Sequence, residues 1–271
     1  MAKHLIFCAD DFAVNEAASR GIAALARGGR LSATSVMVLS PRWAHDAELL
    51  QELRGQIDVG LHLDWTSAFA RAAGHGLPLP GAMLKAVLGG FEQTAARAVI
   101  ERQLDAFEAV WQAPPNHIDG HQHVQQFNGI RQALVAAVQQ RYPAGQRPYL
   151  RLSTCVAADR SLKTRVISGL GAHSLARLAN AAGIGCAPAL SGIYGFAGGG
   201  ERYRQRMARW LRHASEGSIV MCHPAARAEP GDEIGAARAW EQAYLASDAF
   251  SDALTQARVI LSRGAQLNFP A

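Results

Sequence analysis

The sequence predicts an α/β domain built on a parallel sheet. Short apolar runs alternate with amphipathic segments, giving about seven or eight strand–helix units, the pattern of a parallel sheet. No internal repeat or linker interrupts the 271 residues, so we expect one domain over residues 1–271. A closed (β/α) barrel and an open doubly wound sheet both fit. The turn at residues 9–13, ADDFA, has no glycine, which disfavours a dinucleotide-binding sheet.

The first half of the chain predicts strands and helices in alternation. Residues 4–9 form a continuous apolar run typical of a buried strand. Asn15 is suited to cap the helix expected over residues 15–28, and Gly28 and Gly29 are suited to end it. The other elements expected here are strands over residues 34–39, 57–63 and 116–119 and helices over residues 42–53, 91–112 and 130–141.

Residues 64–90 break this alternation. The segment is rich in glycine and proline, and a loop of this length inside a compact domain usually has a function. We expect it to cover the candidate site and to be mobile without ligand. The glycine-rich stretch at residues 190–200 is expected to help shape the same site.

The second half of the chain repeats the pattern less regularly. Residues 186–200 combine strand-like and glycine-rich loop signals. The elements expected here are strands over residues 149–152, 218–222 and 266–269 and helices over residues 161–182, 203–214 and 247–262.

The composition excludes several classes of protein. Lys+Arg 27 against Asp+Glu 22 gives a net charge of only +5. The arginines between residues 202 and 212 recur at helical spacing, which indicates a solvated helix face rather than a nucleic-acid surface. We therefore expect no nucleic-acid partner. The four cysteines lie far apart without CxxC spacing, which argues against a disulfide framework.

We expect no transmembrane segment. The longest uncharged stretch, residues 178–200, contains Pro188 and many glycines, which a spanning helix would not carry. The N-terminus lacks the long apolar region and cleavage site of a signal peptide, so we expect a cytoplasmic protein. The sequence leaves the oligomeric state open, a homodimer included.

Polar residues follow four of the apolar strands: Asp10 with Asp11, His62, the segment 119–123, and His223. In a parallel barrel the carboxyl ends of the strands form the active-site face, so these side chains are expected to share one rim. Each also has a structural interpretation: a helix cap for the acids, a core position for His62, a polar strand end for 119–123, and a strand stopped by proline for His223. Cys8 and Cys222, which precede two of these places, are expected to be small buried hydrophobes.

The chemistry of these residue types points to a divalent metal ion. Asp10 and Asp11 are adjacent like charges, and a cation relieves their repulsion. The segment 117–123, HIDGHQH, brings together three of the ten histidines and one acid. Two histidines with an aspartate are the ligands expected of a catalytic ion that keeps open positions for water.

Four motifs resemble the YdjC-like family of metal-dependent carbohydrate deacetylases: ADDF at 9–12, VGLHL at 59–63, HIDGHQHV at 117–124 and MCHP at 221–224. Their order and spacing match over essentially the whole chain. The resemblance implies a distorted (β/α) barrel that removes acetyl groups from N-acetylated sugars, sugar-lipids included. It also implies one divalent metal ion, for which His₂Asp ligation suits Zn²⁺, with Mg²⁺ or Mn²⁺ as alternatives.

The resemblance also implies a role for each matching residue. Asp11, His62 and His121 would bind the metal. Asp10 would be the general base and His223 the general acid. The sequence departs from the family pattern at three neighbouring positions: Ala13 where glycine is usual, Asp64 where an uncharged residue is commoner, and Gln125 where a further histidine is frequent.

The roles of four further residues stay open. Arg151 either orients Asp10, contacts substrate or is a surface arginine. Asp119 would orient a histidine from behind, His123 is the reserve metal ligand, and Asp64 would bond to His62 or to substrate. Two rival functions remain, namely a metal-dependent phosphoesterase on a similar barrel and a non-catalytic sugar- or metal-binding protein.

Overall fold

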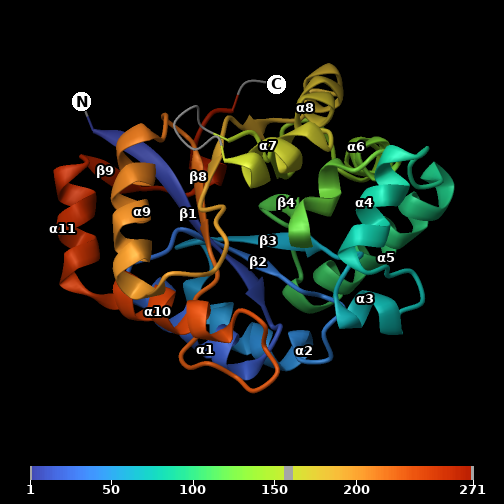
Figure 1. Ribbon diagram of the computed structural model, residues 1–271. Coiled ribbons are helices and arrows are strands. Elements are labelled where there is room, and N and C mark those ends of the chain that lie inside the picture. The colour runs from blue at the N-terminus through green and yellow to red at the C-terminus, as the bar shows by residue number, and fades with distance from the viewer. Residues whose placement is uncertain (1, 156–160, 270–271) are drawn as a thin grey trace.

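The structure is a computed structural model that describes residues 2–155 and 161–269 (Figure 1). Within these residues, eight parallel strands form a nearly closed barrel, with a ninth parallel strand beside the first. This confirms the α/β class and selects the barrel over the open doubly wound sheet. The strands are β1 Lys3–Phe12, β2 Ala33–Val36, β3 Asp58–Leu63, β4 His117–Gly120, β5 Tyr149–Arg151, β6 Cys186–Ala187, β7 Leu190–Ser191, β8 Ile219–Cys222 and β9 Val259–Leu261.

The strand order around the barrel is β6-β5-β4-β3-β2-β1-β8-β7. β6 pairs with β5 and β7 pairs with β8, so the two short strands belong to opposite ends of the sheet. Only Pro188 and Ala189 separate them in the chain, and Leu190 also bridges to Cys155. The short connection between β6 and β7 therefore spans the gap between the two ends of the sheet, where the barrel would otherwise be open.

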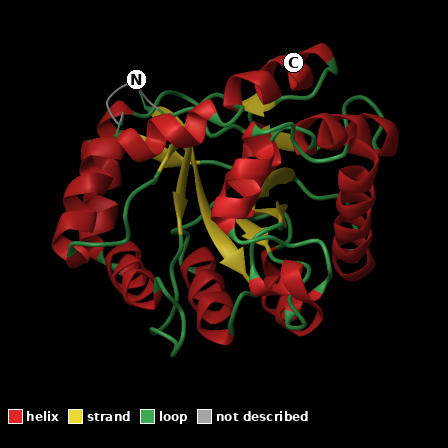
Figure 2. Cartoon of the chain, turned by 45° about the vertical axis from the view of Figure 1, so that its right-hand side comes forward, coloured by secondary structure: helices red, strands yellow, loops and turns green. Residues whose placement is uncertain are grey.

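Helices surround the strands (Figure 2). Asn15 accepts a hydrogen bond from the Ala18 N–H at 2.8 Å, which is the predicted N-cap of α1. The helices are α1 Glu16–Arg27, α2 Trp43–Asp46, α3 Ala68–Ala72, α4 Leu79–Val87, α5 Gln93–Trp111, α6 Ile130–Arg141, α7 Leu162–Gly169, α8 Ala172–Ala181, α9 Gly199–His213, α10 Gly235–Ala246 and α11 Asp248–Gln256. Short 3₁₀ turns cover Ala47–Leu53, His121–Gln126 and Gly264–Gln266.

The segment 64–90 is not the open loop that its composition predicts. It forms α3 and α4, and α4 buries Ala82 and Ala86 against the core. The opposite side of α4 contributes Leu79 and Met83 to the lining of the main pocket. The segment therefore forms part of the pocket wall, whereas the expected covering of the site and the mobility stay predictions.

The C-terminal region differs most from expectation. The helix predicted over 247–262 ends at Gln256, because Arg258 adopts a left-handed φ of +54°, and the chain then enters β9. The strand predicted over 266–269 is absent, and a 3₁₀ turn ends at Gln266 instead. Helix α10 was not anticipated from the sequence at all.

Two further helical predictions were wrong in detail. The helix expected over 161–182 breaks into α7 and α8 at Gly171, which has a positive φ of 131°. The helix expected over 42–53 continues from α2 as a 3₁₀ turn. Periodicity marks these segments as helical but does not locate such breaks.

Surface and cysteine predictions agree with the structure. Arg202, Arg204, Arg209 and Arg212 are exposed on α9, as expected of a solvated face. Cys8 and Cys222 are buried, as expected of small hydrophobes. Among the described residues, no helix combines the length and the apolar character needed to cross a membrane.

Candidate active site

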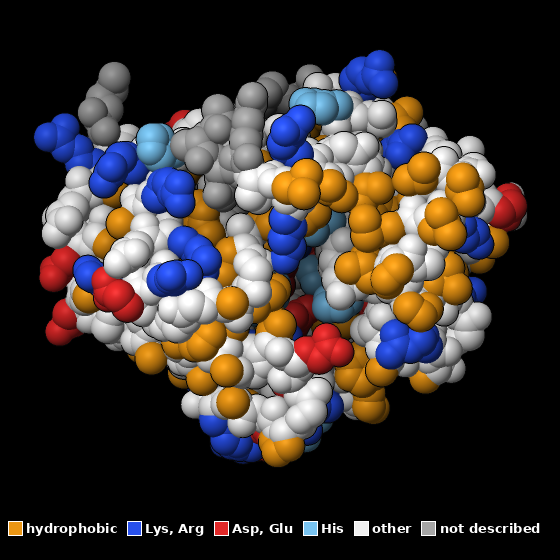
Figure 3. All heavy atoms as spheres, in the orientation of Figure 1, with side chains coloured by type: hydrophobic (Ala, Val, Ile, Leu, Met, Phe, Trp, Pro, Cys, Tyr) orange, Lys and Arg blue, Asp and Glu red, His pale blue; other side chains and the backbone are white. Residues whose placement is uncertain are grey.

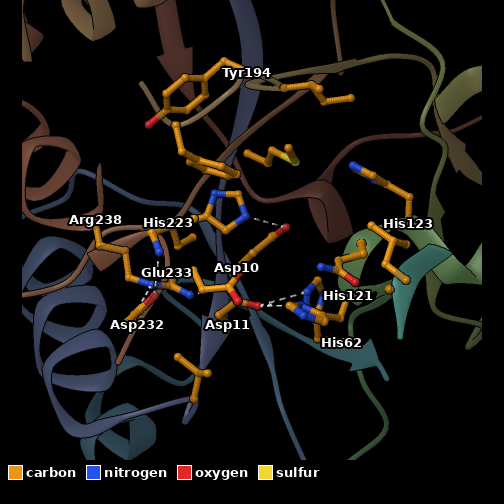
Figure 4. Close-up of a pocket in the computed structure, with 18 of the residues that line it drawn as sticks. Asp10, Asp11, His62, His121, His123, Tyr194, His223, Asp232, Glu233 and Arg238 are labelled. Atoms are coloured by element: carbon orange, nitrogen blue, oxygen red, sulfur yellow. Dashed lines mark hydrogen bonds and ion pairs between the residues drawn. The ribbon is translucent and has the colours of Figure 1, made fainter. Parts of the chain in front are cut away.

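The four predicted strand ends meet in one pocket with a volume of about 1170 Å³. Asp10, Asp11, His62, His121 and His223 all line it, and Figure 4 shows their side chains turned toward one another. In the space-filling view the pocket is a hollow in the middle of the face (Figure 3). The prediction that these residues share one rim is therefore confirmed, while their chemical roles stay predictions.

Asp11, His62 and His121 form a compact cluster. Their potential ligand atoms lie within 4.8 Å of one another. Asp11 Oδ1 accepts from His121 Nδ1 at 3.0 Å and lies 3.4 Å from His62 Nε2. The two imidazole rings are 5.6 Å apart, centroid to centroid. One carboxylate oxygen and two imidazole nitrogens thus converge from three different strand ends.

The parallel register between β3 and β4 orients His62. It pairs His62 with Asp119, and His62 Nδ1 donates to Asp119 Oδ1 at 2.6 Å. This bond fixes the tautomer and leaves Nε2 facing Asp11. Burial would lower the pKa of His62, but Asp119 and Asp10 raise it to about 10. Asp119 therefore orients the His62 ring, in agreement with the prediction that it orients one of the histidines.

Asp119 is the centre of a buried polar network inside the barrel. It accepts from Ser35 Oγ at 2.5 Å and lies 3.0 Å from Arg151 NH1. Ser35 Oγ also lies 2.9 Å from His117 Nε2, and Gly60 leaves room for that imidazole, because a Cβ there would approach the ring to 2.4 Å. Burial would raise the pKa of Asp119, but Arg151 and His62 hold it well below its usual range.

Arg238 of α10 holds the second oxygen of Asp11. Its NH2 donates to Asp11 Oδ2 at 2.7 Å, and its Nε donates to Asp232 Oδ2 at 2.8 Å. Burial would raise the pKa of Asp11, but Arg238 and His121 lower it well below its usual range. Arg238 thus leaves Asp11 Oδ1 as the oxygen that faces both histidines.

Asp10 is held by a bidentate ion pair with Arg151. Arg151 NH1 and NH2 donate to the two Asp10 oxygens at 2.6 and 2.8 Å. Arg151 is only 1% exposed, so the surface interpretation of this arginine was wrong. Planar guanidinium–carboxylate pairing fixes the carboxylate plane as well as its position. Arg151 therefore orients Asp10, the first of the roles left open for it.

His223 faces Asp10 from β8. The parallel register pairs Ala9 with Cys222, and this places His223 Nε2 at 3.9 Å from Asp10 Oδ2. The Phe196 ring packs edge-on against the imidazole at 5.1 Å. Burial lowers the pKa of His223 to about 4, although Asp11 and Asp10 act in the opposite direction. The free imidazole is therefore neutral at pH 7.

Glu241 of α10 supports this side of the pocket. Its carboxylate is fully buried and accepts from Tyr194 Oη at 2.5 Å and from the His223 N–H at 2.6 Å. Burial raises the pKa of Glu241 to about 7, although the two donors lower it. Glu241 thus joins the end of β8 to the aromatic side chain above it.

Stability should depend on pH through Glu241. A carboxyl group whose pKa is raised by folding stabilises the folded state most below its unfolded pKa, and this contribution is lost as the pH rises through the folded value. For a shift from 4.5 to about 7, the loss is on the order of 3 kcal/mol. As the pH rises from about 5 to 8, the free energy of unfolding should therefore fall less for Glu241→Gln than for the wild type. Thermal unfolding at several pH values in this range measures the difference. An equal pH dependence of stability in the two proteins would contradict the raised pKa of Glu241.

Three other predicted residues lie apart from the cluster. His123 bonds to Ser153 Oγ at 3.0 Å, and the left-handed φ of +64° at His123 turns it away from Asp11 in Figure 4. Asp64 accepts from the N–H groups of Thr66 and Ser67, so it organises the turn before α3 rather than pairing with His62. The reserve-ligand and His62-partner interpretations therefore do not hold.

The departures from the family pattern have local consequences. Gln125 is fully buried and donates to the Arg151 carbonyl at 3.1 Å, so it supports the end of β5. Ala13 has a φ of +71°, a conformation that glycine adopts without strain and alanine does not. None of these residues belongs to the converging cluster.

Two further groups in the described part of the chain have metal-ligand geometry, and both include Asp119. One adds Cys8 and His117, and the other adds Asp10 and His62. The Asp119 oxygens already bond to Ser35, His62 and Arg151, and both groups are wholly buried. The Asp11 cluster, by contrast, includes His121, whose side chain is 21% exposed, and it opens into the pocket.

Sequence reasoning missed Arg238, Glu241 and the structural role of Tyr194. Arg238 and Glu241 lie three residues apart on α10, so they share one helix face. A buried pair of charged residues on a predicted helix would have indicated them. However, no helix or strand was predicted over residues 224–246. Arg151 was recognised as a strand-end residue, and its apolar neighbours Leu150 and Leu152 were the signal that it is buried.

Comparisons with known proteins agree with the geometry. Over 185 residues the chain is 30% identical to a chitooligosaccharide deacetylase of Proteus mirabilis, covering 64% of this chain and 69% of the relative. It is 28% identical over 240 residues to a chitooligosaccharide deacetylase of Serratia marcescens, covering 83% of each.

Two solved structures share the fold. One, from Enterococcus faecalis V583, is described as a candidate cellobiose-phosphate cleavage protein and has a TM-score of 0.70 at 20% identity, covering 97% of this chain and 98% of the other. The Xyl-CE4 domain of a multidomain xylanase from a Trinervitermes trinervoides hindgut metagenome has a TM-score of 0.53 at 8% identity, covering 100% and 95%. The family model described as YdjC-like protein matches residues 4–256. The chain therefore belongs to the YdjC-like protein family.

Proposed function

We propose that this protein is a metal-dependent carbohydrate deacetylase that hydrolyses the amide of N-acetylated sugars. One observation carries the proposal: an Asp–His–His cluster and an Asp10–His223 pair face each other inside one pocket. The family membership and the chitooligosaccharide deacetylases among the relatives support the substrate class.

The donor set fits a divalent cation. Asp11, His62 and His121 would hold it, because they are the ligand types of catalytic zinc sites and already converge within 4.8 Å. His62 Nδ1 donates to Asp119, and metal-binding histidines typically donate their other ring N–H to a carboxylate in this way. When bound, such an ion supplies Lewis acidity and lowers the pKa of a coordinated water.

Asp10 and His223 would perform the proton transfers. Asp10, fixed by Arg151, takes the proton of the attacking water. His223 is neutral before the reaction, and negative charge developing on the substrate oxygen favours transfer to His223 of the proton that Asp10 has taken from the water, which returns Asp10 to its charged form. Its Nε2 lies 3.9 Å from Asp10 Oδ2, so the two groups flank one reacting centre. His223 then protonates the departing amine.

The phosphoesterase alternative is less well supported. A phosphate substrate needs cationic groups that are free to bind it. Arg151 and Arg238, which lie next to the cluster, are each paired with two carboxylates. Their charge is used within the protein, so neither arginine is available to a phosphate.

The function is tested by a mass-spectrometric screen of N-acetylated mono-, oligo- and lipid-linked sugars for loss of an acetyl group. The same sugars carrying phosphate esters but no acetyl group serve as the control for the rival activity. Loss of phosphate without loss of acetyl would replace the proposal with the phosphoesterase.

Metal binding should depend on Asp11 and His121 and should release a proton. Asp11→Asn and His121→Ala should each lower metal content well below the one ion per chain expected of the wild type. Because the pKa of His62 is about 10 without metal, binding at neutral pH should displace about one proton from its Nε2. Calorimetry in buffers of different ionisation enthalpy counts that proton. Binding without proton release would mean that His62 is not a ligand.

A further inference from the structure

The adjacent acids Asp10 and Asp11 are each held by a buried arginine, but the two arginines bind them differently. Arg151 places a donor on each carboxylate oxygen of Asp10, at 2.6 and 2.8 Å. Arg238 places a single donor on Asp11, from Nη2 to Oδ2 at 2.7 Å. Both oxygens of Asp10 are therefore bound to its arginine, whereas Asp11 keeps Oδ1 free of any arginine.

The two oxygens of Asp11 face different partners. Oδ1 lies 3.0 Å from His121 Nδ1 and 3.4 Å from His62 Nε2. Oδ2 is bound to Arg238, and Figure 4 shows this arginine and the two histidines on opposite sides of Asp11. A metal ion held by both histidines would meet Oδ1 directly. It could take Oδ2 as well only if the carboxylate left Arg238.

Arg238 is fixed in its place by further contacts. It is only 4% exposed, and its Nε donates to Asp232 Oδ2 at 2.8 Å. Asp232 in turn accepts from Asn15 Nδ2 at 3.2 Å and from the Ile234 N–H at 3.1 Å. Moving the guanidinium away from Asp11 would leave a buried charge with one partner fewer, which is unfavourable. The contact between Arg238 and Asp11 Oδ2 is therefore a built constraint on the carboxylate.

The number of oxygens that a carboxylate gives to a metal ion depends on the size of the ion. Large ions take many ligands and often bind both oxygens of one carboxylate, as Ca²⁺ does. Small ions take fewer ligands at shorter distances, four in most zinc sites and six around Mg²⁺. A carboxylate limited to one oxygen therefore suits a small ion, and it leaves coordination positions open for water and substrate.

We propose that Arg238 selects the metal ion. By holding Asp11 Oδ2, and being held by Asp232, it limits Asp11 to one oxygen and makes the cluster of Asp11, His62 and His121 prefer a small divalent cation to a large one. Arg238 is thus a positioning residue that acts through Asp11. The inference rests on the metal site of the proposed function and adds to it the residue that decides which ions fit.

The test measures the binding of Zn²⁺ and Cd²⁺ to metal-free protein, by competition with a chelator of known affinity. Cd²⁺ has the same charge as Zn²⁺ and also binds imidazole, but it is larger. Loss of the guanidinium charge changes both affinities alike, so it cancels in their ratio. Arg238→Met should lower the ratio of Zn²⁺ to Cd²⁺ affinity about tenfold, the lower end of what residues behind metal ligands contribute. An unchanged ratio would overturn the proposal.

Arg263→Met is the matched control. Arg263 Nε also pairs with a fully buried carboxylate, Asp58, at 3.0 Å. However, Asp58 begins β3, whereas His62 lies near the other end of this strand. The control therefore loses an arginine from a buried aspartate without touching the cluster, and it should keep the wild-type ratio. An equal fall in both variants would indicate a general loosening of the barrel and would overturn the role of Arg238.

A structure of the wild type keeps the inference testable even if Arg238→Met does not fold. In crystals grown with Zn²⁺, Asp11 Oδ1 should lie about 2.0–2.2 Å from the ion, and Oδ2 should still accept from Arg238. Both oxygens on the ion, with Arg238 displaced, would overturn the inference and leave the proposed deacetylase intact. A wild-type protein that binds no divalent ion at the cluster would instead refute the metal site, and this inference with it.

Discussion

Asp10→Asn should lower turnover on an N-acetylated sugar by about 10²–10⁴, the usual contribution of a general base. Asparagine keeps the size of the side chain but cannot take a proton from water. Arg151 still pairs with Asp119 at 3.0 Å in this variant, so the protein should fold. Metal content should stay near one ion per chain, because Asp10 is not assigned as a ligand.

The neighbouring residue provides the matched comparison. Asp11→Asn changes the same chemical group one position along the chain, yet it should lose the metal itself. His223→Ala should resemble Asp10→Asn, with lower turnover and retained metal. Turnover and metal stoichiometry measured on the same preparations distinguish these cases. Loss of metal in Asp10→Asn would mean that the two aspartates are interchanged, and undiminished deacetylation would exclude Asp10 as the base.

The parallel strands explain why so much of this site can be predicted from the sequence. A polar residue directly after an apolar strand lies at the carboxyl end of the barrel, whatever the details of the helices. Asp10, Asp11, His62 and His223 follow this rule and do meet in the pocket. His121 also meets them, although the chain has left the strand at Gly120 before reaching it.

The groups that the sequence did not reveal are those whose positions depend on helix packing. Arg238 and Glu241 reach Asp11 and His223 only because α10 packs beside α1 and α9. No local pattern specifies that packing, since a buried charge on a helix has the same spacing as an exposed one. Likewise, whether His123 or His121 joins the cluster depends on the left-handed backbone at Gln122 and His123, which neither residue type favours.

Replacing Arg151 should cause the largest loss of stability among these variants. Arg151 lies between Asp10 and Asp119 with 1% of its surface exposed. Arg151→Met fills similar space but leaves Asp10 without its cation and Asp119 with His62 alone, and breaking a buried ion pair in this way costs about 3–5 kcal/mol. Arg204→Met is the matched control. Arg204 pairs with Glu201 on the exposed surface of α9, where water screens the pair, so its loss should change stability little.

A double-mutant cycle separates this ion pair from the effect of lost packing. In the Asp10→Asn background, Arg151→Met no longer leaves the Asp10 carboxylate without its cation, so its cost should fall by about 1–3 kcal/mol, within the range measured for coupled contacts. Urea unfolding of the four proteins gives the coupling energy. Turnover of Arg151→Lys adds a second measurement: lysine keeps the charge but cannot hold both Asp10 oxygens in one plane, so activity should fall while most of the stability returns. Additive stability changes in the cycle would show that Arg151 contributes by packing alone and that Asp10 is oriented by other means.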